Sequence, residues 1–465
     1  MAMSGQTVQR SISFRAQDVF YVMQSLLLAR SCALIGVDGI GKTGFLRHLL
    51  SSPVRDHYLA QRSPHMAFLL VDSHALAQPS AFAYYRRMTT CLEQMLTQYG
   101  LKPDTTDELA RVDEEMAIMA LFQRVEALMI FQQVEHLVFV FDEFTLAFTE
   151  VEPHFLRVLH ALRGSYPGCI SYVVTSRNIP ALLCDPVRQK VVYQMFAELF
   201  NGYVHGLKPL EEADAFSQMD LWLTQGRAGL KLSLRKLCFR ASGGHTGLLK
   251  ATVLAVADGS ISLHHQDTLE TFLEQALQNA SVLSQCDLLW QSLSDSEQYC
   301  LRYLRHGLLL RRSLLQPPSS HILDEALKML MLKGILHEVK AETSFQCFSP
   351  LFAAFVARQG VPGLQLDLAR QQVWIDGILQ TKHLTVMEFR LLRFLASHSG
   401  DICPREETTQ AVYGDRYLAK DDAARLDALV ERARKSIGDT SRPPRFLETI
   451  RGVGHRLNDY VGERV

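Results

Sequence analysis

The strongest constraint on the fold is the segment GVDGIGKT at residues 36–43, which fits the glycine-rich Walker A pattern. An apolar, strand-like stretch at residues 31–35 precedes it, and residues 45–50 have helical spacing. A strand, a glycine loop and a helix N-terminus form a cradle in which backbone N–H groups and the helix dipole face an anion. The sequence therefore predicts a phosphate-binding loop, with Lys42 on the β and γ phosphates and Thr43 on Mg²⁺. The predicted nucleotide-binding residues are Gly36, Gly39, Gly41, Lys42, Thr43 and Gly44.

A second apolar run, LVFVFDE at residues 137–143, ends in two acids and matches the Walker B pattern. It is apolar throughout, as expected of a strand buried on both faces of a parallel sheet. Asp142 at its carboxyl end is predicted to hold Mg²⁺ through water, and Glu143 to orient or polarise the attacking water. The alternative, a core strand that ends in acids by chance, is disfavoured by the phosphate loop about one hundred residues upstream.

A further strand is predicted at residues 169–174, and polar residues follow it. A polar residue at such a strand end can sense the γ-phosphate of a bound nucleotide. Strands that alternate with helices around a phosphate loop indicate an α/β fold with a mainly parallel sheet. Ligands bind at the carboxyl ends of the strands of such sheets, and all three polar clusters fall there.

The composition excludes several classes of protein. The net charge of −1 implies no bulk attraction to nucleic acid or membranes, so that any DNA contact must come from a local patch. The nine cysteines contain no C-x-x-C pair, which argues against a zinc site and a disulfide framework. No stretch of eighteen apolar residues is present. We therefore expect a cytoplasmic protein with no membrane association.

The nucleotide-binding segments resemble those of STAND-class ATPases, the AAA+ relatives that include NB-ARC and MalT-like proteins, over about residues 10–360. Residues 36–43 look like the family's P-loop, and TSRN at residues 175–178 resembles its sensor strand, in which the arginine, here Arg177, approaches the γ-phosphate. Residues 242–249 resemble the Gly-Gly-x-Pro-type motif near the adenine, with Thr246 where proline is usual. The resemblance implies catalytic roles for Lys42, Asp142, Glu143 and Arg177.

The last hundred residues show another order of elements. Short strands at residues 366–368 and 372–377 precede a helix at 384–395 that Thr385 caps, a short helix that ends near 413, and a third helix at 422–437. A glycine hairpin follows at residues 446–457. Over residues 364–460 this order resembles the OmpR/PhoB-type winged helix, with the motifs LTVMEFRLL and TIRGVGHRL.

In that family the third helix enters the major groove of DNA and the hairpin wing reaches the neighbouring minor groove. Between residues 425 and 456 eight Lys/Arg face four acids, an excess of four positive charges. The resemblance implies that Arg432 reads a base and that the other contacts go mainly to phosphates. The predicted DNA-binding residues are Arg425, Arg432, Lys435, Arg451 and Arg456.

The predicted chain is thus a multidomain α/β protein. It comprises a P-loop ATPase domain (1–204), a small helical domain (205–280), a winged-helix-like domain (281–360) whose first helix starts with a capping signal at 293–297, and an OmpR/PhoB-type winged helix (361–465). In the STAND family the first winged helix usually packs on the nucleotide. Proline and glycine near residue 361 mark the last boundary.

The predicted function is a slowly hydrolysing ATP/ADP switch that uses Mg²⁺ and controls sequence-specific DNA binding as a transcriptional regulator. It would form a homo-oligomer in the ATP state and respond to an unknown signalling partner or ligand. Two alternatives stay open. One is a STAND defence or signalling protein whose C-terminal winged helix binds a partner protein. The other is an AAA+ DNA-loading or transposition ATPase, which needs an arginine finger in trans, with candidates Arg157, Arg163 and Arg177.

Overall fold

The structure is a computed structural model. It describes residues 10–59, 66–100, 113–130, 134–180, 183, 186–200, 202–223, 229–262, 268–305, 319–339, 344–359, 363–376, 378–380, 384–414, 422–439 and 444–463. The described residues form two compact units, one within 1–298 and 315–354 and the other within 299–314 and 355–465. No helix among them is both long and apolar enough to cross a membrane.

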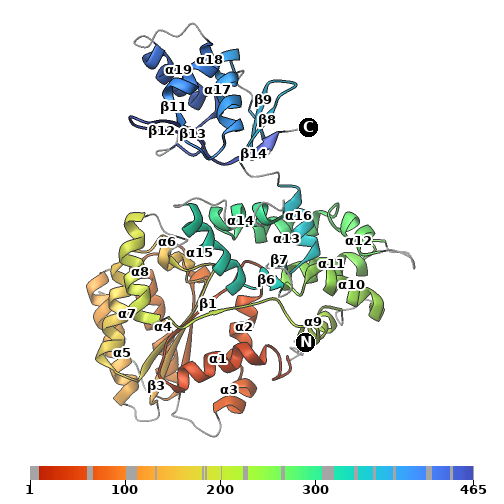
Figure 1. The fold of residues 1–465 in the computed structure, drawn as a ribbon. Helices are drawn as coiled ribbons and strands as arrows, with labels where there is room; N and C mark the ends of the chain where they lie inside the picture. The colour runs from red at the N-terminus through yellow and green to blue at the C-terminus, as the bar shows by residue number, and fades with distance from the viewer. Residues whose placement is uncertain are drawn as a thin grey trace. The chain divides into compact units, whose positions relative to one another are not determined.

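A five-stranded parallel sheet lies at the centre of the N-terminal unit, as the sequence predicted (Figure 1). Its strand order is β2-β3-β4-β1-β5. Every residue of β1, β3 and β4 is buried, which explains why these strands are apolar runs without alternation. The strands are β1 (Cys32–Ile35), β2 (Met66–Asp72), β3 (His136–Asp142), β4 (Ile170–Ser176) and β5 (Val204–Gly206).

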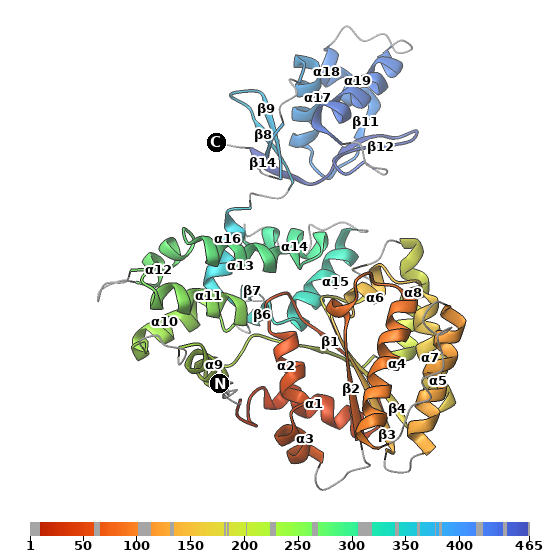
Figure 2. The ribbon, with the colours of Figure 1, turned by 180° about the vertical axis from the view of Figure 1, so that it is seen from behind.

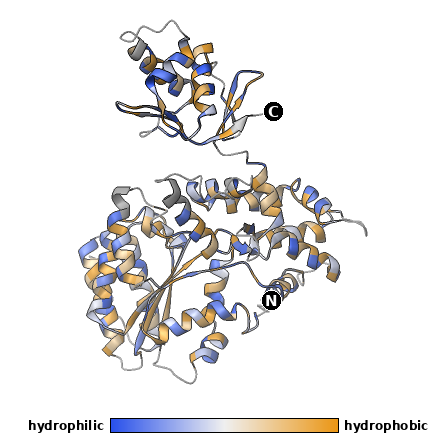
Figure 3. Cartoon of the chain, in the orientation of Figure 1, coloured by the Kyte–Doolittle hydropathy of each residue, from blue (hydrophilic) through white to orange (hydrophobic). Residues whose placement is uncertain are grey.

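Helices cover both faces of this sheet. In both views α1, α2 and α3 lie on one face, and α4, α5, α7 and α8 lie on the other (Figures 1 and 2). The bounds are α1 (Ala16–Leu27), α2 (Lys42–Leu49), α3 (Ser52–Leu59), α4 (Ala81–Gln98), α5 (Glu114–Ile130), α6 (Thr145–Thr149), α7 (His154–Ser165) and α8 (Pro186–Phe200), with a short 3-10 turn η1 (Ser73–Ala75) before α4. Apolar colour marks the strands between these layers (Figure 3). The core contains a cluster of aromatic rings from the sheet and from α4 and α7, including Tyr84, Phe141 and Phe155.

A run of helices follows the sheet: α9 (Glu212–Leu223), α10 (Leu232–Ser242), α11 (Thr246–Ala257), α12 (Leu269–Ala276) and α13 (Ala280–Gln291). Next come α14 (Asp295–Arg305), α15 (Ser319–Leu332), the antiparallel hairpin of β6 (Leu336–Val339) and β7 (Ser344–Cys347), and α16 (Pro350–Ala357). The predicted capping signal is confirmed, because the Glu297 carboxylate accepts the Ser294 backbone N–H at 2.9 Å. The order of helices and hairpin is the one that the sequence indicated.

The C-terminal residues form three helices and two small sheets. The helices are α17 (Val386–Ser397), α18 (Arg405–Tyr413) and α19 (Asp422–Ile437). One sheet has the order β10-β9-β8-β14 and the other β11-β13-β12. The strands are β8 (Leu364–Asp367), β9 (Gln372–Ile375), β10 (Ile378–Leu379), β11 (Cys403–Pro404), β12 (Leu447–Ile450), β13 (Gly454–Leu457) and β14 (Tyr460–Glu463). Thr385 caps α17 in a capping box with Glu388, as predicted.

Candidate nucleotide-binding site and DNA-binding surface

The predicted phosphate loop joins the end of β1 to the start of α2. Gly39 and Gly41 both have positive φ, at 78° and 98°, a region that L side chains rarely adopt. A Cβ on Gly39 would also lie 2.8 Å from Cε1 of the His245 ring. Both positions therefore require glycine, and the loop can close tightly around the N-terminus of α2.

The outward carbonyls of this loop are held by donors from the N-terminus of α11. The Asp38 carbonyl accepts Nε2 of His245 at 3.0 Å, the Gly39 carbonyl accepts the Gly247 N–H at 2.8 Å, and the Ile40 carbonyl accepts the Thr246 hydroxyl at 2.9 Å. Because a trans peptide points its N–H opposite to its carbonyl, these bonds turn the N–H groups of Gly39 and Gly41 away from α11. The bonds fix the peptide planes in an arrangement suited to an anion.

His245 was not predicted as a site residue, although it lies within the segment 242–249 that the resemblance places near the adenine. Its ring is fully buried, and this burial lowers the pKa of His245 to about 4. The ring is therefore neutral at physiological pH. Its Nδ1 accepts the Leu248 N–H at 3.3 Å, so the proton lies on Nε2 and is donated to the Asp38 carbonyl. The segment at 242–249 thus contacts the phosphate loop, while its predicted contact with adenine stays a prediction.

The segment before α1 also contacts this loop. Arg15 is buried, and its backbone φ is 51°. Its guanidinium donates to the Ile40 carbonyl at 3.1 Å and to the Lys208 carbonyl at 3.0 Å. Arg10 donates to the Gly44 carbonyl at 2.8 Å. Two arginines from the segment before α1 therefore bond to backbone carbonyls in and next to the phosphate loop. Neither contact was predicted from the sequence.

Lys42 lies inside the loop at the first position of α2. Its Nζ donates to the Gly36 carbonyl at 3.0 Å and to Oδ1 of Asp38 at 3.2 Å. It lies 3.6 Å from Oε2 of Glu143. Thr43 is half-buried on the same first helical turn. Lys42 is thus 7% exposed and lies between acceptors that a phosphate could replace.

The carboxyl ends of β3 and β4 bring the predicted acids to the same edge of the sheet. Asp142 accepts the Thr175 hydroxyl at 2.8 Å and the Glu143 backbone N–H at 3.0 Å, both on Oδ1. The Glu143 N–H also contacts the Thr175 hydroxyl at 2.9 Å. These bonds hold Glu143 at φ 53°, an unfavourable conformation that costs about 1–3 kcal/mol and is found mainly at functional sites. Thr175 is therefore the residue that orients both acids.

Arg177 joins the same group of charges. Its Nε lies 3.3 Å from Oε1 of Glu143 and 3.6 Å from Oδ1 of Asp38. Burial on its own would raise the pKa of Glu143, but Lys42, the Thr145 hydroxyl and Arg177 lower it below its ordinary value. Glu143 is therefore ionised at neutral pH and can accept a proton from water. The structure thus brings all four predicted catalytic residues together.

The donor set suits Mg²⁺ only in part without a nucleotide. Among the described residues no group of three or more His, Cys, Asp or Glu side chains could hold a metal ion. Thr43 and Asp142 supply a hydroxyl and a carboxylate, the oxygen donors that Mg²⁺ takes together with phosphate oxygens and water. The residues therefore fit an ion that arrives with a nucleotide, and they do not form a dedicated metal site.

The arginines proposed for action in trans differ in their surroundings. Arg163 donates to the Leu199 and Glu198 carbonyls at 2.5 and 2.7 Å, so it caps the end of α8. Arg157 is exposed on α7. Arg177 contacts Glu143 in its own site. Arg163 is thus occupied by a structural role in this conformation.

A buried ion pair lies beside the end of β4. Nζ of Lys333, after α15, is 2.6 Å from Oε1 of Glu297 in α14, and both side chains are fully buried. The other oxygen of Glu297 accepts Nδ2 of Asn178 at 2.9 Å. Asn178 directly follows Arg177, so the predicted γ-phosphate sensor is one residue from a contact with α14. A charged residue in a helical pattern looks solvated in sequence, which is why this pair was not predicted.

The predicted recognition helix α19 has two distinct faces. Its buried face consists of Leu426, Leu429, Val430, Ala433 and Ile437. Its exposed face carries Arg425, Arg432 and Lys435. Arg432 is 63% exposed and lies 4.0 Å from Glu388 of α17. Arg451 is exposed at the turn of the wing, where Gly452 has φ 76°. Four of the five predicted DNA-binding residues are thus exposed, three of them on one helix face.

The fifth, Arg456, is half-buried and pairs with Glu448 across the wing at 2.6 Å. The remaining acids between 425 and 456 also have partners within the domain. Asp427 pairs with Arg405, and Glu431 pairs with Arg434 at 2.5 Å. These pairings compensate the negative charges that would otherwise oppose a phosphate backbone. A DNA contact of Arg456 stays a prediction.

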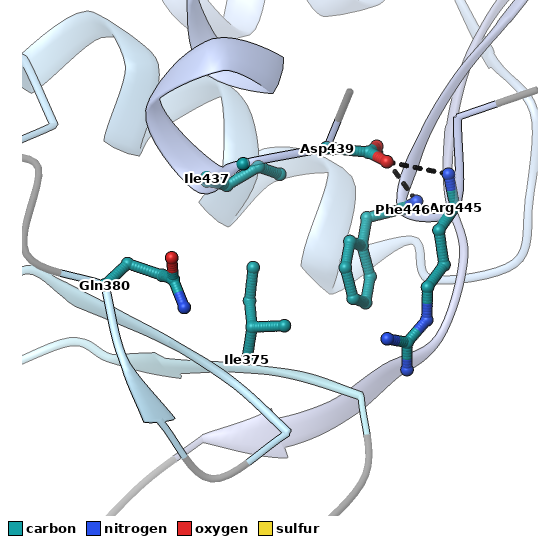
Figure 4. A pocket seen from close by; sticks show the side chains of 7 residues that line it. Ile375, Gln380, Ile437, Asp439, Arg445 and Phe446 are labelled. Atoms are coloured by element: carbon teal, nitrogen blue, oxygen red, sulfur yellow. Dashed lines mark hydrogen bonds between the residues drawn. The ribbon is translucent and has the colours of Figure 1, made fainter. Parts of the chain in front are cut away.

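Asp439 connects the end of α19 to the wing. It accepts the backbone N–H groups of Arg445, Phe446 and Leu447 at 2.7, 3.0 and 2.9 Å. Figure 4 shows the first two of these bonds. Arg445 in turn forms a bidentate pair with Asp376 at 2.8 and 2.9 Å. A cavity of about 460 Å³ lies here, lined by Ile375, Gln380, Ile437, Gly438, Asp439, Arg445 and Phe446. The contacts orient the wing relative to α19 and the sheet of β8 to β10.

Arg434 fixes the same arrangement from the middle of the helix. Its Nε donates to the Leu447 carbonyl at 2.8 Å, and its Nη2 donates to the Thr449 hydroxyl at 2.8 Å. Arg434 therefore positions the wing, whereas its neighbours Arg432 and Lys435 face outward.

Comparisons with known proteins give different matches for the C-terminal and the N-terminal parts of the chain. Residues 380–457 match the family model described as "Transcriptional regulatory protein, C terminal". Protein PetR of Rhodobacter capsulatus is 35% identical over 81 residues, which cover 17% of this chain and 34% of PetR. The chain thus spans about a third of the length of this curated relative. The DNA-binding domain of CpxR from E. coli is 32% identical, covering 21% of this chain and 91% of that chain with a TM-score of 0.18.

The N-terminal part is similar to solved ATPase structures. A Walker-type ATPase of Pyrococcus abyssi is 12% identical, with a TM-score of 0.46 over 74% of this chain and 95% of that chain. The Aeropyrum pernix ORC2 protein, described as ADPNP-ADP complexes, is 15% identical, with a TM-score of 0.39 over 77% of this chain and 97% of that chain. The details of the site rest on the contacts of this chain and not on these distant likenesses.

Proposed function

We propose that this chain is an ATP-dependent switch that controls sequence-specific DNA binding, and so acts as a transcriptional regulator. It combines a P-loop ATPase-like core with a DNA-binding winged helix of the transcriptional-regulator type. The observation that carries this proposal is that Lys42, Glu143 and Arg177 meet at the edge of a parallel sheet, beside the phosphate loop. The Glu143 carboxylate lies 3.6 Å from Nζ of Lys42 and 3.3 Å from Nε of Arg177. An ionised carboxylate beside the phosphate loop can orient the water that hydrolysis requires.

The roles of the side chains follow from their positions. Lys42 binds the β and γ phosphates, the ionised Glu143 orients the attacking water and accepts its proton, and Arg177 contacts the γ-phosphate. Thr43 and Asp142 would hold Mg²⁺, which neutralises phosphate charge when bound. Glu143 is already engaged by Lys42 and Arg177, so it must be released before it can act. Slow turnover, suited to a switch, is the expected consequence.

Two sets of contacts can carry the nucleotide state to the helical segments. The first is the N-terminus of α11, where His245, Thr246 and Gly247 contact three consecutive carbonyls of the phosphate loop. The second runs from Arg177 through Asn178 to Glu297 of the first winged helix. A γ-phosphate that moves Arg177 would also move Asn178 and so change its contact with Glu297. A shift follows only if ATP and ADP bind the two arrangements with different affinity.

At the DNA surface, Arg432 contacts a base edge in the major groove, and Arg425, Lys435 and Arg451 contact phosphates. We further propose that the chain forms a homo-oligomer in the ATP state, which places several winged helices on repeated half-sites. The protein-adaptor and DNA-loading alternatives predict other outcomes in the tests. A loading ATPase should be strongly stimulated by DNA, while a regulator should be stimulated weakly.

The proposal is tested by selecting bound sequences from a random duplex library with the full chain in ATP and in ADP. A motif enriched in one nucleotide state supports the proposal. The Lys42→Ala variant, which should not bind ATP, is the control and should enrich the same sequences with either nucleotide. Enrichment of no sequence in either state would contradict the proposal and favour the protein-adaptor reading of the C-terminal domain.

A further inference from the structure

Asp38, the third residue of the phosphate loop, is an acid to which the roles above assign nothing. Its side chain is 29% exposed and faces the site. Its Oδ1 lies 3.2 Å from Nζ of Lys42 and 3.6 Å from Nε of Arg177. These are the two cations that the proposed function assigns to the phosphates. One carboxylate oxygen therefore bridges both.

The backbone keeps Asp38 in this place. Its carbonyl accepts Nε2 of the buried His245, and the next residue, Gly39, accepts the Gly247 N–H. The carboxylate can therefore leave the two cations by rotating its side chain, but the peptide cannot withdraw while α11 stays in contact with the loop. The position of Asp38 is tied to the same contacts that are proposed to carry the nucleotide state.

The charges around Asp38 decide which phosphates it opposes. Lys42 and Arg177 face two carboxylates, Asp38 and Glu143, so the four charges balance. A β-phosphate requires Lys42 alone, whereas a γ-phosphate requires both Lys42 and Arg177. ATP must therefore displace Asp38 from two cations and place additional negative charge beside it. ADP displaces it from only one.

We propose that Asp38 is a specificity-determining residue that occupies the γ-phosphate position on Lys42 and Arg177 and makes the site select ADP over ATP. This inference rests on the proposed function and adds a direction to it. The chain rests in the ADP state, and ATP binds well only when Asp38 has rotated away. Rotation of the side chain releases both cations, while the contact of His245 with the Asp38 carbonyl holds the peptide in place.

The test uses the full chain and its Asp38→Asn variant, which keeps the size of the side chain and removes its charge. Isothermal titration gives the Kd of ADP and of the non-hydrolysable analogue AMP-PNP, each with Mg²⁺. The ratio of the AMP-PNP Kd to the ADP Kd should fall by at least about fivefold. That is the factor for removing one like charge at ~4 Å in a water-like dielectric. The Asp56→Asn variant changes the same charge at an exposed position of α3 and should leave the ratio unchanged.

A second comparison isolates the role of Arg177. In an Arg177→Ala background, the substitution Asp38→Asn should change the ratio less than it does in the wild-type chain, because the bridge to Arg177 no longer exists. An unchanged ratio in Asp38→Asn, or an equal gain for both nucleotides, would overturn the inference while leaving the proposed function intact. Failure of the wild-type chain to bind either nucleotide would instead refute the proposed function.

Discussion

The buried pair of Glu297 and Lys333 gives the sharpest stability prediction. Replacing Glu297 by Gln leaves the fully buried Lys333 ammonium without its counter-charge. Removing one partner of a buried ion pair costs about 3–5 kcal/mol, because the remaining charge has lost its solvation and its partner. Lys333→Met should cost less, because Glu297 would still accept hydrogen bonds from Asn178 and Ser294. The double variant should lie within ~1–2 kcal/mol of the wild-type chain, since no buried charge is left.

Native-state hydrogen exchange at the amides of residues 324–332 in α15 measures this local stability in the full chain. The coupling energy between the two substitutions should reach about 3 kcal/mol. Burial already lowers the pKa of Lys333, although Glu297 opposes that effect, and removing Glu297 lowers the pKa further. The unfolded Glu297→Gln chain then binds more protons than the native one at alkaline pH, so its free energy of unfolding should rise with pH up to ~10. Additive costs for the two substitutions would refute the reasoning.

Further outcomes follow from the same contacts. Lys42→Ala should abolish ATP binding, and Glu143→Gln should keep binding while blocking turnover; normal hydrolysis in the latter variant would remove the role of Glu143. Arg432→Ala should weaken specific DNA binding by about 1–3 kcal/mol and relax sequence preference at one base. Arg434→Ala should instead lower the melting temperature of the domain, because Arg434 is bonded to the wing. Burial on its own would raise the pKa of Asp376, but the bidentate bond from Arg445 lowers it. This pair therefore stabilises the domain fully above the unfolded pKa of ~3.9. Its contribution is lost as the pH falls through the lower folded pKa. Acid titration of Asp376→Asn should lack this component.

Much of the fold could be predicted because its signals are local. The strands β1, β3 and β4 are apolar runs that end at polar residues, and burial on both faces of a parallel sheet produces that pattern. The third helix of the C-terminal domain was predicted at 422–437 and observed at those bounds, since its apolar positions repeat with helical spacing. The glycines of the phosphate loop were likewise visible, because positive φ demands them.

Other features depend on contacts between distant residues and could not be seen. Strand β14 pairs in parallel with β8, almost one hundred residues earlier, and its four residues are too few to show a strand pattern of their own. His245 looks like an ordinary polar residue, yet it is buried against a carbonyl of the phosphate loop 207 residues away. From the sequence, Lys333 would be expected at a solvated helix end, because lysine is rarely buried without a partner.

The domain boundaries predicted at 204, 280 and 360 stay predictions. The described residues form two compact units, and the contacts of the helical segments with the phosphate loop lie within one of them. The predicted adenine contact at 242–249 also stays a prediction. What the structure adds is the route by which these segments contact the site, through α11 and through Glu297.

The central claim is that the nucleotide state and DNA affinity are linked in one chain. Its most direct test measures the Kd of a selected duplex with AMP-PNP and with ADP, and the Kd of each nucleotide with and without that duplex. The account predicts that the ratio of DNA affinities equals the ratio by which DNA changes the preference for the two nucleotides, since linkage is reciprocal. A ratio of about 5–150 would be typical of such coupling. Equal DNA affinity in both nucleotide states would contradict the account.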